Sequence, residues 1–174
     1  YLSYRSKLAK FEKKENISKK KNILVVLQFT ELPEFFINYL KKNKDNFNWY
    51  FRYHPLYPIP DNTKFFLNSF AIEDIQKTSA RDLHDTFSFT NLIVTLYSTV
   101  AFEAQIHKIP TIFMGDYAKK GFKNLLGKNG LFYAKNEFDL NNYLNNLNAI
   151  SRIDKVHLEF DANKIKKVIK DSLN

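Results

Sequence analysis

The sequence between residues 91 and 115 limits most strongly what this chain can fold into. Residues 92–96 are an apolar run rich in branched side chains, which is typical of a strand buried on both faces of a parallel sheet. Tyr97, Ser98 and Thr99 end that run with hydroxyl groups, which suit the start of a helix over residues 100–107. A second strand is predicted over residues 109–114. A strand that leads into a helix N-terminus favours phosphate binding, because backbone N–H groups and the helix dipole point outward there.

The rest of the chain repeats this alternation of strand and helix. Apolar runs predict strands over residues 23–29 and 47–53, and a short edge strand over residues 131–133. Helical spacing is found over residues 34–43, 63–70, 82–89, 139–147 and 161–173. Residues 71–78 fit a short strand or a turn, and residues 116–130 form a polar, glycine-punctuated connection. The pattern predicts an α/β fold: a doubly wound, mostly parallel sheet with helices on both faces.

The basic charge of the chain is concentrated at its start. Residues 1–22 hold eight basic and two acidic side chains, so they carry +6 of the net charge of +9. We treat residues 1–22 as a basic lead-in or linker and residues 23–174 as one domain. Lysine predominates over arginine, so a solvated segment is favoured; contact with anionic lipid is the alternative, and no nucleic-acid partner is expected. We expect a cytoplasmic protein, with peripheral contact at the inner membrane as the alternative.

Two features of the sequence bear on cofactors and on completeness. The chain has no cysteine, no HExxH motif and no glycine-rich phosphate loop, and His84, His107 and His157 lack partners at metal-ligand spacing. We therefore expect neither a metal nor another cofactor. The chain begins with Tyr1 and without an apolar signal segment, so we expect it to be a piece of a longer protein.

Polar side chains follow three of the predicted strands. They are Gln28 and Thr30, then Arg52 and His54, then Tyr97, Ser98 and Thr99. The carboxyl ends of parallel strands share one edge of a sheet, where ligands of such folds bind, so these groups are expected to converge. Ser98 and Thr99 can offer hydroxyl and backbone N–H groups to a phosphate, or simply cap the helix. Glu103 lies one helical turn after Thr99 and could accept hydrogen bonds from a ribose, or face solvent.

His54 and Arg52 are the candidates on the second strand. Pro55 imposes an extended backbone on His54, whose imidazole could donate to a phosphate oxygen or, when protonated, offset the charge of a leaving group. A turn histidine without function is the alternative. Arg52 should point to the same side of the strand, toward phosphate or toward an ion pair with Glu73 or Asp74.

Several of these motifs together resemble a known family. They are Arg52-Tyr53-His54-Pro55, Ser79 to Leu83, Val94 to Ala104 with its Ser-Thr-x-x-x-Glu pattern, and Ile109-Pro110-Thr111. The set resembles the C-terminal, donor-nucleotide-binding half of GT-B glycosyltransferases of bacterial surface polysaccharides, such as the polysialyltransferase-like and capsule-transferase groups with a His-Pro motif. It is also similar to CDP-glycerol glycerophosphotransferases. The resemblance covers residues 23–147.

The resemblance implies a role for each candidate residue. His54 would support the departing nucleotide phosphate, Ser98 and Thr99 would bind the phosphates, and Glu103 would bind the ribose. The donor would be a nucleotide-activated sugar, such as a CMP- or UDP-sugar, bound without metal. Such enzymes have an N-terminal lobe that supplies acceptor contacts and a base, and it is missing here, so the isolated chain is expected to be inactive. Half of a sugar-nucleotide 2-epimerase and a non-catalytic α/β binding module are the alternatives.

Overall fold

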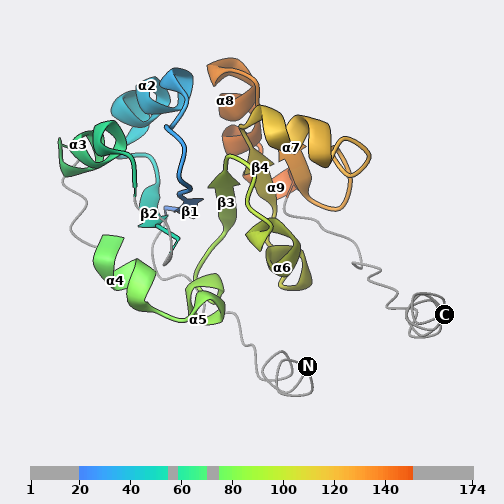
Figure 1. Cartoon of the computed structure of the whole chain (residues 1–174). Helices are drawn as coiled ribbons and strands as arrows, with labels where there is room; N and C mark the ends of the chain where they lie inside the picture. The colour runs from blue at the N-terminus through green and yellow to red at the C-terminus, as the bar shows by residue number, and fades with distance from the viewer. Residues whose placement is uncertain (1–19, 55–58, 70–74, 151–174) are drawn as a thin grey trace, which may run out of the picture.

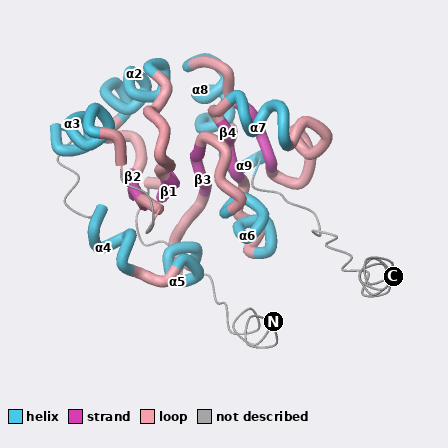
Figure 2. The backbone as a smooth tube through the Cα atoms, in the orientation of Figure 1, coloured by secondary structure: helices cyan, strands magenta, loops and turns pink. Residues whose placement is uncertain are grey.

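A five-stranded parallel sheet forms the centre of the computed structural model, which describes residues 20–54, 59–69 and 75–150 (Figures 1 and 2). The strands are β1 (Asn22–Val26), β2 (Asn48–Arg52), β3 (Leu92–Thr95), β4 (Thr111–Phe113) and β5 (Leu131–Tyr133). Their order is β2-β1-β3-β4-β5, and every neighbouring pair is parallel. The predicted doubly wound α/β class is confirmed, and β5 is an edge strand as expected.

Helices cover both faces of this sheet (Figure 1). One face carries α2 (Glu34–Asn43), α3 (Asp61–Ser69), α8 (Glu137–Asn145) and α9 (Leu147–Ile150). The other carries α5 (Leu83–Phe87), α6 (Val100–Ile106) and α7 (Asp116–Gly121), while α4 (Ile75–Ala80) packs beside β2. Every residue of β1, β3 and β4 is buried, which is why their sequences are continuous apolar runs without alternation.

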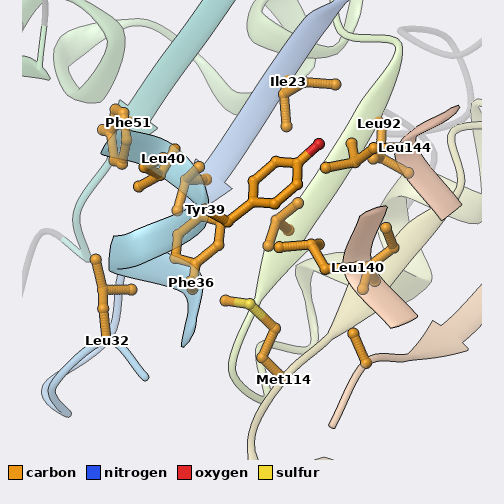
Figure 3. Close-up of a cluster of buried hydrophobic side chains, with 14 of the residues drawn as sticks. Ile23, Leu32, Phe36, Tyr39, Leu40, Phe51, Leu92, Met114, Leu140 and Leu144 are labelled. Carbon is orange, nitrogen blue, oxygen red and sulfur yellow. The ribbon is translucent and has the colours of Figure 1, made fainter. Parts of the chain in front are cut away.

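The larger hydrophobic core lies between α2, α8 and the sheet (Figure 3). Phe36, Tyr39 and Leu40 project from one stripe of α2 and are buried. The Trp49 ring meets Phe36 edge-on, with ring centroids 6.1 Å apart. Burial, assisted by the nearby charge of Glu137, raises the pKa of Tyr39 to about 12, so this phenol stays neutral. The helical spacing found over residues 34–43 therefore reflects a stripe of side chains that belongs to the core.

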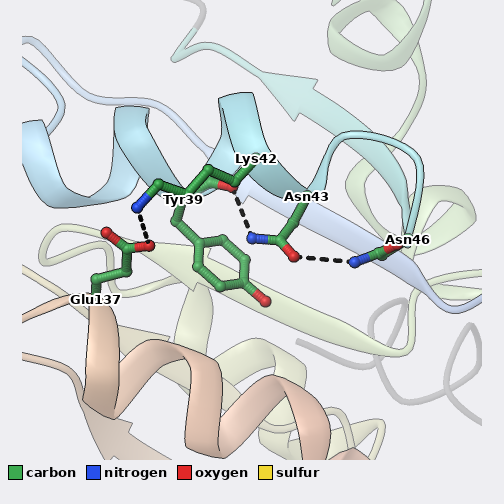
Figure 4. A network of polar contacts seen from close by, with 5 residues as sticks. All are labelled: Tyr39, Lys42, Asn43, Asn46 and Glu137. Carbon is green, nitrogen blue, oxygen red and sulfur yellow. Dashed lines mark hydrogen bonds and ion pairs between the residues drawn. The ribbon is translucent and has the colours of Figure 1, made fainter.

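Polar contacts hold the end of α2 and join it to α8 (Figure 4). Lys42 Nζ lies 2.8 Å from Glu137 Oε1, and Asn43 Nδ2 donates to the Tyr39 carbonyl at 3.1 Å. Asn46 Nδ2 donates in turn to Asn43 Oδ1 at 2.9 Å. Because the ion pair is exposed to solvent, it contributes about 0–1 kcal/mol, far less than the core beside it.

Asparagine side chains tie the amino ends of three strands together. The Asn22 N–H donates to Asn91 Oδ1 at 2.8 Å, and Asn48 Nδ2 donates to Asn22 Oδ1 at 2.9 Å. Asn22 Nδ2 also donates to the Phe89 carbonyl at 2.8 Å. These bonds satisfy buried polar groups and align β1 with both of its neighbours.

Two segments differ from the sequence prediction. The described part of residues 71–78 is helical, as α4, because Arg52 of β2 binds carbonyl groups at its carboxyl end. Residues 116–121 form α7 instead of an irregular connection, with Ala118 buried against α6 and β4. Residues 1–19 of the basic lead-in and the helix predicted over residues 161–173 lie outside the described residues. Nowhere in residues 20–54, 59–69 and 75–150 is a helix both long and apolar enough to cross a bilayer.

Candidate functional site

The carboxyl ends of the five strands lie along one edge of the sheet, because all of its pairs are parallel. After β1 the chain turns to β2 on one side, whereas β3, β4 and β5 extend on the other side. The space beyond the carboxyl ends of β1 and β3 is therefore the topological switch point, where ligands of doubly wound sheets bind. The residues that follow β1 and β3 form the centre of the candidate site.

Hydrogen bonds join these two strand ends. Gln28 Oε1 accepts from the Tyr97 N–H at 2.9 Å and lies 3.3 Å from Thr95 Oγ1. Thr95 Oγ1 also lies 3.0 Å from the Val26 carbonyl oxygen, and the hydroxyls of Thr30 and Tyr97 are 2.9 Å apart. Two of the three polar groups expected at this edge are thus in direct contact. The fixed Tyr97 backbone positions Ser98 and Thr99, which follow it.

Ser98 and Thr99 differ in their local contacts. Ser98 Oγ accepts from the Val100 N–H at 3.3 Å, so Ser98 performs the capping interaction of α6. The Thr99 side chain makes no such bond and is exposed. Ser98 therefore caps the helix, which was the alternative role for both residues, whereas the Thr99 hydroxyl takes no part in capping.

Glu103 lies on α6, one turn after Thr99, and is partly exposed. Across the described ranges, no other side chain forms a hydrogen bond or an ion pair with its carboxylate. A carboxylate in this state can accept hydrogen bonds from a diol without first breaking an internal contact.

Arg52 is held by the neighbouring helix. Its Nη1 donates to the carbonyls of Thr78 at 2.8 Å and Arg81 at 2.7 Å, which satisfies the carboxyl end of α4. Burial lowers the pKa of Arg52, opposed by the charge of Asp82. A phosphate would have to meet the other N–H groups of this guanidinium. Glu73 and Asp74, the alternative partners, lie outside the described residues.

His54 is exposed and follows the end of β2 by two residues. β1 separates β2 from β3, and adjacent strands lie about 4.8 Å apart, so the ends of β2 and β3 are about 10 Å apart. The end of β2, which leads to His54, is thus separated from the Ser98–Thr99 turn by the width of β1. Pro55 lies outside the described residues.

The structure also brings together two histidines that the sequence left without partners. His84 Nδ1 and His107 Nε2 are 3.1 Å apart, and Phe87 packs against both rings. His107 follows the end of α6, which runs back from the carboxyl edge toward the start of β4. The pair thus lies away from the candidate site. Because the two histidines are 23 residues apart in the sequence, a search for metal-ligand spacing does not pair them.

We expect the His107 imidazole to make stability depend on pH. Burial, reinforced by the charge of His84, lowers the pKa of His107 from 6.5 to about 4. Between about pH 6.5 and pH 4 the unfolded chain binds a proton at this position that the folded chain does not bind. The contribution is therefore fully present above pH 6.5, and acidification to pH 4 should remove about 3 kcal/mol from the free energy of unfolding.

Urea denaturation at pH 7.5, 6.0, 5.0 and 4.0 measures this effect. Carboxylates titrate in the same range, so the informative quantity is the difference between the wild-type chain and His107→Gln, which cannot titrate. Below pH 6.5 the free energy of unfolding of the wild-type chain should fall more steeply with acidification than that of His107→Gln. Parallel curves over the whole range would contradict the buried, neutral state of His107.

No cluster of three or more His, Cys, Asp or Glu side chains that could hold a metal ion occurs in the described part of the chain.

No protein-family profile and no curated protein sequence matches this sequence. Solved structures do match. One is the wall teichoic acid polymerase TagF, with a TM-score of 0.54 and 20% identity over 98% of this chain and 49% of that chain.

A second match is a crystal structure described as a UDP-N-acetylglucosamine 2-epimerase from Listeria monocytogenes. Its TM-score is 0.56 and its identity 16%, over 96% of this chain and 51% of that chain. A TagF variant soaked with CDPG matches with a TM-score of 0.52 and 20% identity, over 99% of this chain and 48% of that chain. The chain thus spans about half the length of each. At these identities the likeness shows the fold alone: a Rossmann-like α/β unit built on a parallel sheet.

Proposed function

We propose that this chain is the donor-nucleotide-binding lobe of a bacterial glycosyltransferase that builds capsule, lipooligosaccharide or another surface glycan. The observation that carries the proposal is the convergence of Gln28, Thr30 and the 97–99 turn at the switch point of a parallel sheet. The fold likeness to a teichoic acid polymerase and to a 2-epimerase supports it.

In this proposal each candidate residue has a separate task. Ser98 and Thr99 bind the phosphates through backbone N–H and hydroxyl groups, and Glu103 accepts hydrogen bonds from the ribose. His54 approaches from the end of β2 and stabilises negative charge as the nucleotide leaves. Arg52 anchors α4 and adds positive charge on the same strand. The donor is a nucleotide-activated sugar such as a CMP- or UDP-sugar, and no further cofactor takes part.

The proposal also assigns tasks outside this chain. This chain covers about half of each matched structure, and in the proposal a second lobe outside this chain supplies the acceptor contacts and the base. The isolated chain should therefore bind nucleotide without turnover. We place the protein in the cytoplasm with a solvated basic segment over residues 1–22; contact of this segment with the inner membrane is the alternative. Co-sedimentation with anionic but not with neutral vesicles, abolished by deleting residues 1–19, would support that contact; this deletion leaves β1 intact.

Isothermal titration of the chain with CMP, CDP and UDP tests nucleotide binding. Glu103→Ala and His54→Ala should each weaken binding of the preferred nucleotide about 10-fold, since each removes one hydrogen bond to a ligand group. Asp45→Ala is the matched control, because this exposed carboxylate lies in the turn before β2, at the amino edge. Its affinity should equal that of the wild-type chain.

The outcomes separate the rival functions. Unchanged affinity in both Glu103→Ala and His54→Ala would remove the site assignment, even if nucleotide binds. No binding of any nucleotide would favour a non-catalytic α/β module. Half of a 2-epimerase is favoured by the similarity to the Listeria structure; a full-length protein that equilibrates UDP-N-acetylglucosamine with its 2-epimer, without an acceptor, would establish it.

A further inference from the structure

Tyr117 is an exposed aromatic side chain at the carboxyl edge of the sheet. It lies in the first turn of α7, directly after β4, and its side chain is 75% exposed. One side of its ring is nevertheless supported: the Tyr97 ring meets it at an interplanar angle of 62°, with centroids 5.5 Å apart. The Tyr97–Tyr117 pair thus presents a supported aromatic surface next to the Ser98–Thr99 turn.

Tyr97, the inner member of the pair, is fixed from three directions. Its N–H donates to Gln28 Oε1, its hydroxyl is hydrogen-bonded to Thr30 Oγ1, and its ring packs against both neighbouring hydrophobic clusters. A ring held in this way loses little conformational entropy when a ligand packs against it or its neighbour.

Gly115 sets the distance between the two tyrosines. Its N–H donates to the Leu96 carbonyl at 2.9 Å, and a Cβ at this position would lie 2.7 Å from that same oxygen. Only glycine allows the turn after β4 to approach the turn after β3 this closely. The approach places Tyr117, two residues after Gly115, against Tyr97, one residue after Leu96.

We propose that the Tyr97–Tyr117 pair binds the sugar ring of the donor, an inference that rests on the proposed nucleotide site. Tyrosine provides an apolar surface for the C–H face of a pyranose and a hydroxyl for its rim, and the Thr30 hydroxyl lies beside it. In a nucleotide sugar, ribose and sugar lie on opposite sides of the phosphates. Along the chain, Tyr97 and Glu103 likewise flank the Ser98–Thr99 turn, and Tyr117 packs on Tyr97.

Affinity measurements on ligand pairs that differ only in the transferred group test this. The pairs are UDP-N-acetylglucosamine with UDP, CMP-N-acetylneuraminic acid with CMP, and CDP-glycerol with CDP, the last lacking a sugar ring. For the nucleotide sugar that binds, Tyr117→Ala should weaken affinity about 3- to 10-fold and leave the free nucleotide unchanged. Tyr117→Phe should retain most of the affinity. Phe138→Ala, which removes another exposed aromatic side chain from the first turn of α8, should have no effect.

Three results would overturn the inference. In the first, Tyr117→Ala weakens the affinity for the nucleotide sugar and for the free nucleotide equally, which would place the base on the pair. In the second, Tyr117→Ala weakens neither affinity; in the third, the wild-type chain binds CDP-glycerol but neither of the two nucleotide sugars. If no nucleotide binds, the proposed function fails, and saturation-transfer NMR with free N-acetylglucosamine and N-acetylneuraminic acid decides the sugar site separately. Transfer to ring protons that disappears in Tyr117→Ala would support it, and its absence in the wild-type chain would overturn it.

Discussion

Replacing Phe36 with alanine is expected to lower the free energy of unfolding by about 3–5 kcal/mol. The Phe36 side chain is 0% exposed and packs between α2 and the sheet, edge-on to Trp49. Truncation removes the buried ring and leaves a cavity that the surrounding Tyr39 and Leu40 cannot fill without leaving their own positions. Urea denaturation at neutral pH, followed by far-UV circular dichroism, gives the value.

Phe138→Ala is the control for this core substitution. It removes the same ring from a side chain that is 72% exposed, so the change should stay within about 0.5 kcal/mol. A similar, small loss for both substitutions would mean that α2 does not pack on the sheet as described.

Replacing Gly115 with alanine should cost about 2–4 kcal/mol, an unusually large effect for one added methyl group. Gly115 has φ −92° and ψ 144°, a conformation open to any residue, so backbone strain contributes nothing. The cost comes from the Cβ, which would lie 2.7 Å from the Leu96 carbonyl oxygen and 3.1 Å from its carbon. Separating the two turns would also weaken the hydrogen bond from the Gly115 N–H.

Gly121→Ala distinguishes the steric effect at Gly115 from the effect that any replacement of glycine by alanine has on stability. Gly121 ends α7, and a Cβ there would meet no atom within 4 Å. Alanine should therefore be neutral or stabilise the chain by up to about 1 kcal/mol, through its helix propensity and the lower entropy of the unfolded state. Equal stability of both variants in thermal and urea denaturation would contradict the close contact between the 96–97 and 115–117 turns.

The sheet could be predicted from the sequence because its signal is local. Residues 23–27 and 92–96 are apolar runs of strand length, which are typical of strands buried on both faces of a parallel sheet. Three helices were missed, α4, α7 and the four-residue α9. Two of them, α4 and α7, depend on tertiary contacts. The carboxyl end of α4 is bound by Arg52, and α7 is fixed by Gly115 and by the burial of Ala118. Neither contact leaves a periodic pattern in a six-residue helix.

The candidate site was predictable only as a set of strand ends. Polar residues after three apolar runs predicted a shared carboxyl edge, and these residues lie at the carboxyl ends of β1, β2 and β3. The bond from the Tyr97 N–H to Gln28 spans 69 positions, and the carbonyl partners of Arg52 are likewise distant in sequence. The Tyr97–Tyr117 pair depends on the absence of one Cβ at Gly115. Contacts of this kind follow from the fold and not from the spacing of residues.

The position of β1 between β2 and β3 has a consequence for how the chain is synthesised and folds. β1 reaches its first partner 26 residues later, but its second partner, aligned through Ile23 and Leu92, leaves the ribosome only after a further 40 residues or so. Until then one edge of a very apolar strand has no partner within the nascent chain, and such edges pair readily with other chains. Translation pauses or truncations between residues 53 and 91 should therefore produce the species most prone to aggregate.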